Sequence, residues 1–274
     1  MMIQRLRQGF SMLELVMVIV VLGIVSSIGA EIIANVYEGY IVQRAQHRAS
    51  IKTEIVATQI ANRLAYAIPG TVVRKTSAAL GLDAGTDINM PAPIATNPNV
   101  LQWVGADMDS FNAITSNADT LPGWSGFCDF DASTTASIST PGSNLGLVNT
   151  IMANLGLGQT PQIYFPSTGL VSATTSNLAG TTITLNPATS KIVEHYKLAT
   201  SSYALEAKND DELWLHYNFS PIRDTTINGT SVRLLRNVTT FRFRGDGRTI
   251  RFKICVRESI GDDNITVCKE KAVF

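Results

Sequence analysis

The sequence predicts an α+β protein, in which one long N-terminal helix packs on an antiparallel β-sheet head that carries a loop-rich insert. Three observations predict this class: a basic N-terminus leads into an apolar run, a helical pattern continues without proline to Pro69, and the last third alternates apolar and polar residues. With 274 residues, 45% of them hydrophobic, the chain is long enough for one sizeable or two small domains.

Charge divides the chain into three blocks, although its formal net charge is zero. Residues 1–75 carry eight Lys/Arg and four acidic residues, 76–190 carry seven Asp and no Lys or Arg, and 191–274 carry fourteen Lys/Arg and eleven acidic residues. The neutral total argues against nucleic-acid binding by bulk charge. We interpret the middle block as an insert.

The N-terminal segment has the form of a membrane-targeting sequence. Arg5 and Arg7 precede an apolar run in which no residue from Leu15 to Ala30 is charged. This run is shorter than the roughly 20 residues that a spanning helix needs, so we expect the span to reach back to Phe10. The basic residues before the run place the N-terminus in the cytoplasm and everything after about Ile33 across the membrane.

Glu14 is a carboxylate inside the predicted span. Such a group costs on the order of 2.5–3.5 kcal/mol on insertion scales, so it requires a partner. If the chain is cut between Gly9 and Phe10, Glu14 becomes the fifth residue of the mature protein, about one helical turn from the new amino group. It can then neutralise its own amine or that of a neighbouring subunit. The alternative is an interfacial carboxylate that snorkels to the headgroups.

The segment GFSMLELVMVIVVLGIVSSIG resembles the class III signal of type IV pilins and type II secretion pseudopilins. In that family a short basic leader ends in Gly, the next residue is usually Phe and the fifth mature residue is Glu, as in Gly9, Phe10 and Glu14. The resemblance implies that a prepilin peptidase cuts after Gly9, that the amine of Phe10 is methylated, and that Glu14 helps subunits to dock into a fibre. The Ser-Met-Leu at 11–13 replaces the frequent Thr-Leu-Ile and leaves the cut site intact.

These features divide the chain into five segments. We expect a leader at 1–9, the transmembrane half of the helix at 10–33, its periplasmic amphipathic half at 34–68, a loop-rich acidic insert at 69–190 and the β-sheet head at 191–274. A helix from 10 to about 67 would be roughly 87 Å long at 1.5 Å per residue. A coiled-coil dimer is the alternative, but no strict heptad is maintained.

The periplasmic half of the helix should present an apolar stripe to the head. Helical spacing assigns this stripe to Ile33, Val36, Tyr37, Tyr40 and Ile41, and Ile51, Ile55, Leu64 and Ile68 continue it with gaps. Pro69 and Gly70 form the stop signal.

The insert is rich in Ser, Thr, Asn, Gly, Ala and Pro, with little sustained periodicity. We therefore expect loops on the outer side of the head. The pairs Asp107 with Asp109 and Asp129 with Asp131 raise the question of calcium, but no EF-hand spacing is present. Solvated loop carboxylates are the expected interpretation.

The last third predicts antiparallel strands. In ELWLHYNF, polar neighbours alternate with the apolar residues Leu213, Leu215, Tyr217 and Phe219. In TIRFKICV one face consists of Ile250, Phe252, Ile254 and Val256.

The final hairpin predicts a disulfide. A two-residue turn that begins at Gly261 sets a register in which Cys255 lies directly opposite Cys268, at a non-hydrogen-bonded site. An exported domain favours the bridge over two free thiols. The odd cysteine, Cys128, is then either buried and inert or paired outside the chain.

No nucleophile elbow, phosphate loop, dinucleotide-binding turn or zinc-protease motif is present in the sequence. We therefore predict a non-enzymatic protein without cofactor or metal. Arginines on the strand faces could form a basic patch for DNA or an acidic partner subunit, or could simply be solvated; they are Arg242, Arg244, Arg248, Arg251 and Arg257.

The stretch from Tyr203 to Val256 resembles the end of J-type minor pseudopilins and W-type minor pilins. Together with the N-terminal signal, it implies a minor pseudopilin of a type II secretion pseudopilus in the bacterial inner membrane, with a periplasmic head. Its partners would be prepilin peptidase and other pilins or pseudopilins in a hetero-oligomeric fibre. The alternatives are a minor pilin of a type IV pilus or DNA-uptake fibre, where nucleic acid would be a partner, and a signal-anchored periplasmic binding domain.

Overall fold

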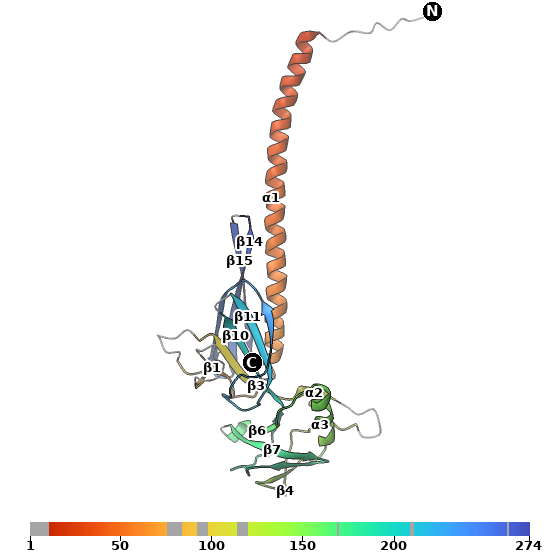
Figure 1. Ribbon diagram of the computed structural model, residues 1–274, viewed down its shortest axis with the longest axis vertical. Coiled ribbons are helices and arrows are strands. Elements are labelled where there is room, and N and C mark those ends of the chain that lie inside the picture. Colours follow the sequence, from red (N-terminus) through yellow and green to blue (C-terminus); the bar gives the residue numbers. More distant parts are fainter. Residues whose placement is uncertain are drawn as a thin grey trace, which may run out of the picture. The chain divides into compact units, whose positions relative to one another are not determined.

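The computed structural model describes residues 11–75, 84–91, 98–113, 120–168, 170–208, 211–261 and 263–274. The chain divides into two units: Met1–Arg48 with Glu258–Ile265, and Ala49–Arg257 with Thr266–Phe274. Helix α1 (Met12–Leu64) is uninterrupted and belongs to both units (Figure 1). Its last sixteen residues pack on antiparallel sheets, which confirms the predicted α+β class.

Two antiparallel sheets pack against the end of α1. The first has the order β12-β11-β10-β3-β1-β2, with β1 (Val73–Lys75), β2 (Thr86–Asp87), β3 (Val100–Gly105), β10 (Ser201–Lys208), β11 (Glu212–Phe219) and β12 (Thr230–Leu235). The second has the order β13-β14-β15, with β13 (Val238–Asp246), β14 (Thr249–Ile260) and β15 (Asp263–Val273).

The helix and these two sheets share one apolar core. Val56, Ala57, Ile60 and Leu64 of α1 pack in it. The first sheet contributes Leu101, Trp103, Leu205, Leu213 and Leu215, and the second contributes Phe241, Ile250, Phe252, Ile254 and Val256. The predicted inward face of β14 is thereby confirmed.

The apolar stripe predicted for the end of α1 is wrong in part. Ile51 and Ile55 are 45% and 52% exposed, whereas Ala49, Thr53 and Ala57 are fully buried. Small side chains let the helix backbone approach the sheets closely, so packing selects this face over the more apolar one. Ile68 lies beyond the helix, in a separate cluster with Val104, Tyr164 and Ala199.

The alternation predicted for β11 also fails at its end. Asn218 has a φ of 58°, and the pairing of β11 with β10 shifts between Ser202 and Ala204. A bulge of this kind inserts a residue and turns the following side chains to the other face. Phe219 is therefore buried with Val100, Ala204 and Ile227, away from Leu213 and Leu215.

The segment predicted as a loop-rich insert contains a third, ordered sheet. Its order is β4-β5-β8-β7-β6-β9, with β4 (Asp129–Thr134), β5 (Ser137–Ser139), β6 (Gln162–Phe165), β7 (Val171–Ala179), β8 (Thr182–Leu185) and β9 (Lys197–Ala199). Helices α2 (Met108–Asn112) and α3 (Leu145–Asn154) and the 3₁₀ turn η1 (Pro166–Thr168) accompany it.

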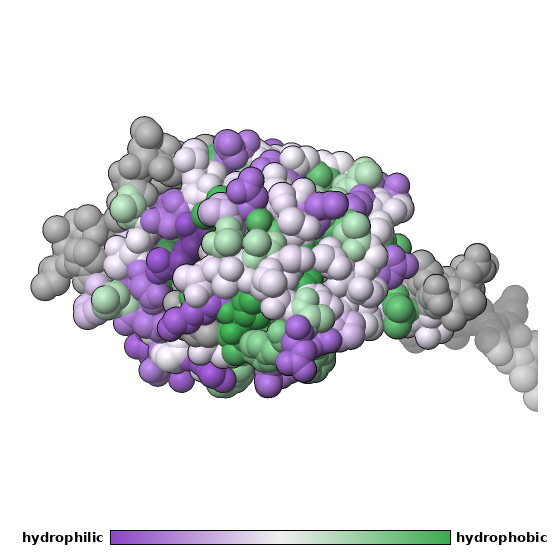
Figure 2. Space-filling view, turned by 90° about the horizontal axis from the view of Figure 1, so that it is seen from below, coloured by the Kyte–Doolittle hydropathy of each residue, from purple (hydrophilic) through white to green (hydrophobic). Residues whose placement is uncertain are grey.

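This third sheet has its own core, which includes Trp124, Ile138, Leu145, Val148, Ile163 and Ile183. The predicted boundary between insert and head at residue 190 is wrong, because both sheets contain strands from both sides of it. β1–β3 come before residue 190 but belong to the first sheet, and β9 comes after it but belongs to the third. Apart from β7, the strands of the third sheet have three to six residues, so their alternation is too brief to recognise in the sequence. Figure 2 shows a face of the molecule on which green hydrophobic residues form a patch among purple hydrophilic ones.

Cys128 is a free cysteine that packs in this third-sheet core, where it is 9% exposed. Burial raises the pKa of its thiol to about 12. At neutral pH the thiol is therefore protonated, and a protonated thiol is a poor nucleophile. Of the two fates expected from the sequence, the structure favours the buried, inert cysteine.

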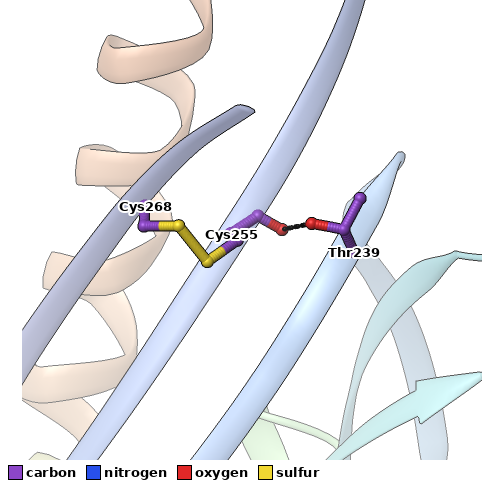
Figure 3. The surroundings of a disulfide bond; sticks show 3 residues. All are labelled: Thr239, Cys255 and Cys268. Carbon is purple, nitrogen blue, oxygen red and sulfur yellow. Dashed lines mark hydrogen bonds between the residues drawn. A yellow bond between two sulfur atoms is a disulfide. The ribbon is translucent and has the colours of Figure 1, made fainter. Parts of the chain in front are cut away.

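The predicted disulfide Cys255–Cys268 is present and joins β14 to β15 (Figure 3). The two Cα atoms are 4.0 Å apart. Gly261 begins the connecting turn with a φ of 56°, a conformation that glycine adopts without strain. The hydroxyl of Thr239 on β13 donates to the carbonyl of Cys255 at 3.4 Å, so Cys255 on the central strand β14 contacts both neighbouring strands, and the bridge ties the edge strand β15 to it.

Glu54 on α1 forms ion pairs with β15. The ammonium of Lys271 donates to a Glu54 carboxylate oxygen at 2.6 Å and to the hydroxyl of Thr58 at 3.0 Å, and Lys269 lies 3.5 Å from the other carboxylate oxygen. The hydrogen bond from Lys271 holds the pKa of the Glu54 carboxyl below its ordinary value of 4.5. These ion pairs supplement the apolar contacts that hold the helix on the sheets.

Lys271→Met is expected to lower the thermal midpoint by about 1–2 °C at pH 7, because solvated ion pairs contribute little. A carboxyl whose pKa falls on folding stabilises above its unfolded pKa, and that contribution is lost as pH falls through the folded pKa. The difference between variant and wild type should therefore vanish in acid. Thermal unfolding at pH 7 and below pH 4 tests this, with Lys191→Met as the exposed control; a difference that persists in acid would contradict it.

Candidate functional site

The first turn of α1 is the part of the described chain nearest to the predicted processing site. The backbone N–H of Glu14 donates to the carbonyl of Ser11 at 3.1 Å and to its hydroxyl at 3.2 Å. Ser11 therefore caps the helix, and Glu14 sits at the third helical position. The sequence interpretation missed this cap, although a Ser followed three residues later by Glu is the capping-box signal.

Glu14 begins an exposed face of α1. The residues that share this face follow at helical spacing: Met17, Val18, Val21, Leu22 and Val25. Their side chains are 55–68% exposed in the single chain. A face this apolar is stable in lipid or against other apolar helices, and not in water.

The apolar surface extends around the whole first half of the helix. Large side chains from Met12 to Ile33 are exposed on every side. α1 is long and apolar enough to cross a membrane, and it lies near the N-terminus. A helix that is apolar all round belongs in a bilayer or in the interior of an assembly.

The Glu14 carboxylate has no ion-pair partner within the described ranges of the chain. Gly9 and Phe10, the predicted cleavage pair, lie outside the described residues. The structure therefore places Glu14 in the first turn of the helix and leaves the proposed contact with a mature amino terminus to experiment.

The other residues considered from the sequence belong to the second unit. Asp107 caps α2, where one carboxylate oxygen accepts from the N–H of Ser110 at 3.2 Å. Burial raises the pKa of Asp107, while Asp109 is exposed. No group of three or more potential metal-ligating side chains occurs in the part of the chain that the structure describes.

The candidate site in the first turn of α1 offers few functional groups. It offers one carboxylate at the end of an apolar helix face, capped by one hydroxyl. Such an arrangement can pair with a cation inside a low-dielectric environment, where an ion pair is strong only if both partners are present. It is suited to recognition between membrane segments.

Comparison with known proteins agrees with this geometry. The family model of the prokaryotic N-terminal methylation motif matches residues 4–30. No curated protein and no solved structure matches the chain. The match spans the basic leader, Glu14 and the apolar face of α1, and it supports anchoring in the inner membrane, processing by prepilin peptidase and assembly with other pilins. The N-terminus therefore carries the prokaryotic N-terminal methylation motif, and this match supports a type IV pilin-like subunit.

Proposed function

We propose that the chain is a non-enzymatic minor pseudopilin, a structural subunit of a type II secretion pseudopilus. It is made as an inner-membrane precursor with a cytoplasmic leader and a periplasmic head. Prepilin peptidase cuts after Gly9, the amine of Phe10 is methylated, and the mature subunit joins a hetero-oligomeric fibre. The observation that carries the proposal is the methylation motif at residues 4–30, continued by an exposed apolar helix.

The first turn of α1 supports a role for Glu14 in assembly. Glu14 lies four residues after Phe10, about 6 Å along the axis if the helix extends that far. The Ser11 cap holds this turn in helical form. In an apolar environment the carboxylate gains most from the positive amine of its own or a neighbouring subunit.

The head supports a minor subunit. Among the described residues, its two largest apolar cores are separate: one includes residues of α1 and the other lies in the third sheet. A subunit repeated along the shaft must leave room for its neighbours at every position, whereas one at the tip is free to carry a large head. The likeness of the last third to J-type minor pseudopilins points the same way.

Mass spectrometry of the N-terminus of membrane-extracted protein tests the proposal. The expected mature chain begins with N-methylated Phe10. A chain that retains Met1, or one cut beyond Ala30, would contradict processing as a pilin-like subunit.

A second measurement separates secretion from the pilus alternative. Deletion of the gene should stop export of type II substrates and leave twitching motility and DNA uptake intact. The reverse phenotype would assign the subunit to a type IV pilus or uptake fibre.

A further inference from the structure

A cluster of basic side chains lies on the outer face of β13 and β14. Arg242 is paired in register with Lys253, and Arg244 with Arg251. All four side chains are exposed. None of them makes an ion pair within the described ranges. We call these four residues the strand-face cluster.

The two strands hold these charges in place. Like charges directly opposite each other across an antiparallel pair destabilise it. The residues that alternate with the cluster, Phe241, Phe252 and Ile254, are buried in the core, so the register cannot shift to separate the charges. A bound surface of negative charge would remove the repulsion.

Two acids border the cluster without neutralising it. Asp246 lies two residues after Arg244 on β13, and Glu270 lies on the neighbouring strand β15. Both are exposed, and neither makes an ion pair among the residues that the structure describes. Arg248 and Arg257 are exposed as well, so the surface around the cluster has an excess of positive charge.

Three of the four residues in the cluster are arginines. A guanidinium group presents planar N–H donors that match the two oxygens of a carboxylate. Complementary charges across an interface set its specificity more than its strength. The cluster is therefore suited to selecting a protein surface that exposes Asp and Glu side chains.

The strength of such contacts indicates how this partner is held. One exposed ion pair shifts an equilibrium by about five-fold at most. Four pairs together would shift it by less than about a thousand-fold, which corresponds to a millimolar dissociation constant. A freely diffusing protein would stay mostly unbound at micromolar concentrations, whereas a protein tethered next to the cluster by a second contact has a high effective concentration.

We propose that the strand-face cluster docks on an acidic head surface of a different pilin-like subunit, the neighbour of this subunit in the fibre. The inference rests on the proposed function, in which the apolar helices of the two subunits supply the second contact. A minor subunit adjoins subunits of other kinds, so the partner is not a second copy of this chain. The helices provide most of the affinity, and the cluster selects the acidic neighbour.

Nucleic acid fits the cluster less well. Proteins that bind single strands combine cations with aromatic side chains for base stacking, and here the aromatic residues Phe241 and Phe252 are buried in the core. Duplex binding requires a broad basic surface, whereas this chain has zero net charge.

Photo-crosslinking in cells that assemble the native fibre tests the contact. A benzophenone amino acid replaces Thr249, a half-buried residue paired with Asp246 at the border of the cluster, so that all four cations remain. The expected product joins this chain to a second protein with an N-methylated mature terminus, through a peptide rich in Asp and Glu. Crosslinks to a second copy, nucleic acid, lipid or a protein without that terminus, or the absence of a crosslink, would overturn the inference.

Charge reversal adds a quantitative arm. Arg251→Glu should lower the yield of this product at least about five-fold, the effect of one exposed charge pair, and a Glu→Arg or Asp→Arg change in the crosslinked peptide of the partner should restore it. The variant places opposite charges at the pair 244 and 251, so its thermal midpoint should not fall. Lys191→Glu, the same charge change at an exposed site outside the cluster, should leave the yield unchanged. An unchanged yield with Arg251→Glu would contradict the contact.

The N-terminus is analysed by mass spectrometry in the same samples. Processed subunits that enter fibres but give no crosslink to an acidic neighbour would sink the inference and leave the proposed function standing. Unprocessed subunits would refute both.

Discussion

Glu14→Gln is expected to leave cleavage after Gly9 normal and to reduce incorporation into fibres by at least about ten-fold. Glutamine keeps the size and helical position of Glu14, so the Ser11 cap, which uses the backbone N–H, is retained. The substitution removes the negative charge that would neutralise a mature amine. A charge left without its partner in an apolar environment is costly, and about 1.4 kcal/mol already corresponds to a factor of ten.

Quantitative immunoblotting of sheared fibres against membrane-bound subunit measures this loss. Glu31→Gln is the matched control, since Glu31 is an exposed carboxylate on the same helix, after the uncharged run. It should assemble like wild type. Equal incorporation of Glu14→Gln and wild type would reduce Glu14 to an interfacial carboxylate that the membrane tolerates.

The N-terminal methylation motif and the apolar helix that follows it could be predicted from the sequence because their signals are local. The charge asymmetry around the apolar run and the isolated Glu14 are properties of neighbouring residues, independent of the tertiary fold. Helix α1 was likewise predictable, since no proline interrupts it before Pro69.

The packing face of α1 was not predictable in the same way. Both sides of its last turns carry apolar residues, and the choice of Val56 and Ile60 over Ile51 and Ile55 depends on the sheets that meet them. Helical periodicity supplies candidate stripes, and the tertiary contact selects one.

The third sheet escaped the sequence for a different reason. Strands such as β5 and β8 have three and four residues, and one or two buried side chains, such as Ile138 in β5 and Ile183 in β8, provide their packing. A segment of this length completes at most two periods of alternation, so its Ser and Thr content is interpreted as loop. The pairing of β3 with β10 spans more than ninety residues and leaves no local trace.

Removal of the Cys255–Cys268 disulfide is expected to destabilise the edge of the head by roughly 3 kcal/mol. The bridge closes a loop with a sequence separation of 13, and it fastens the edge strand β15 to β14. The double variant Cys255→Ala/Cys268→Ala should therefore increase hydrogen exchange of the β15 amides from Thr266 to Val273 by about a hundred-fold. Mass spectrometry of peptides from the mature protein in detergent measures this locally.

Two controls make the result specific. Amides of β7 lie in the third sheet, which has a separate core, so their exchange should not change in the double variant. Dithiothreitol should accelerate β15 exchange in wild type and have no effect on the variant, because Cys128 is buried and its pKa is raised to about 12. Unchanged β15 exchange would mean that the contacts of Val273 and the Lys271–Glu54 pair suffice to hold the strand, and the bridge would then be dispensable for the head.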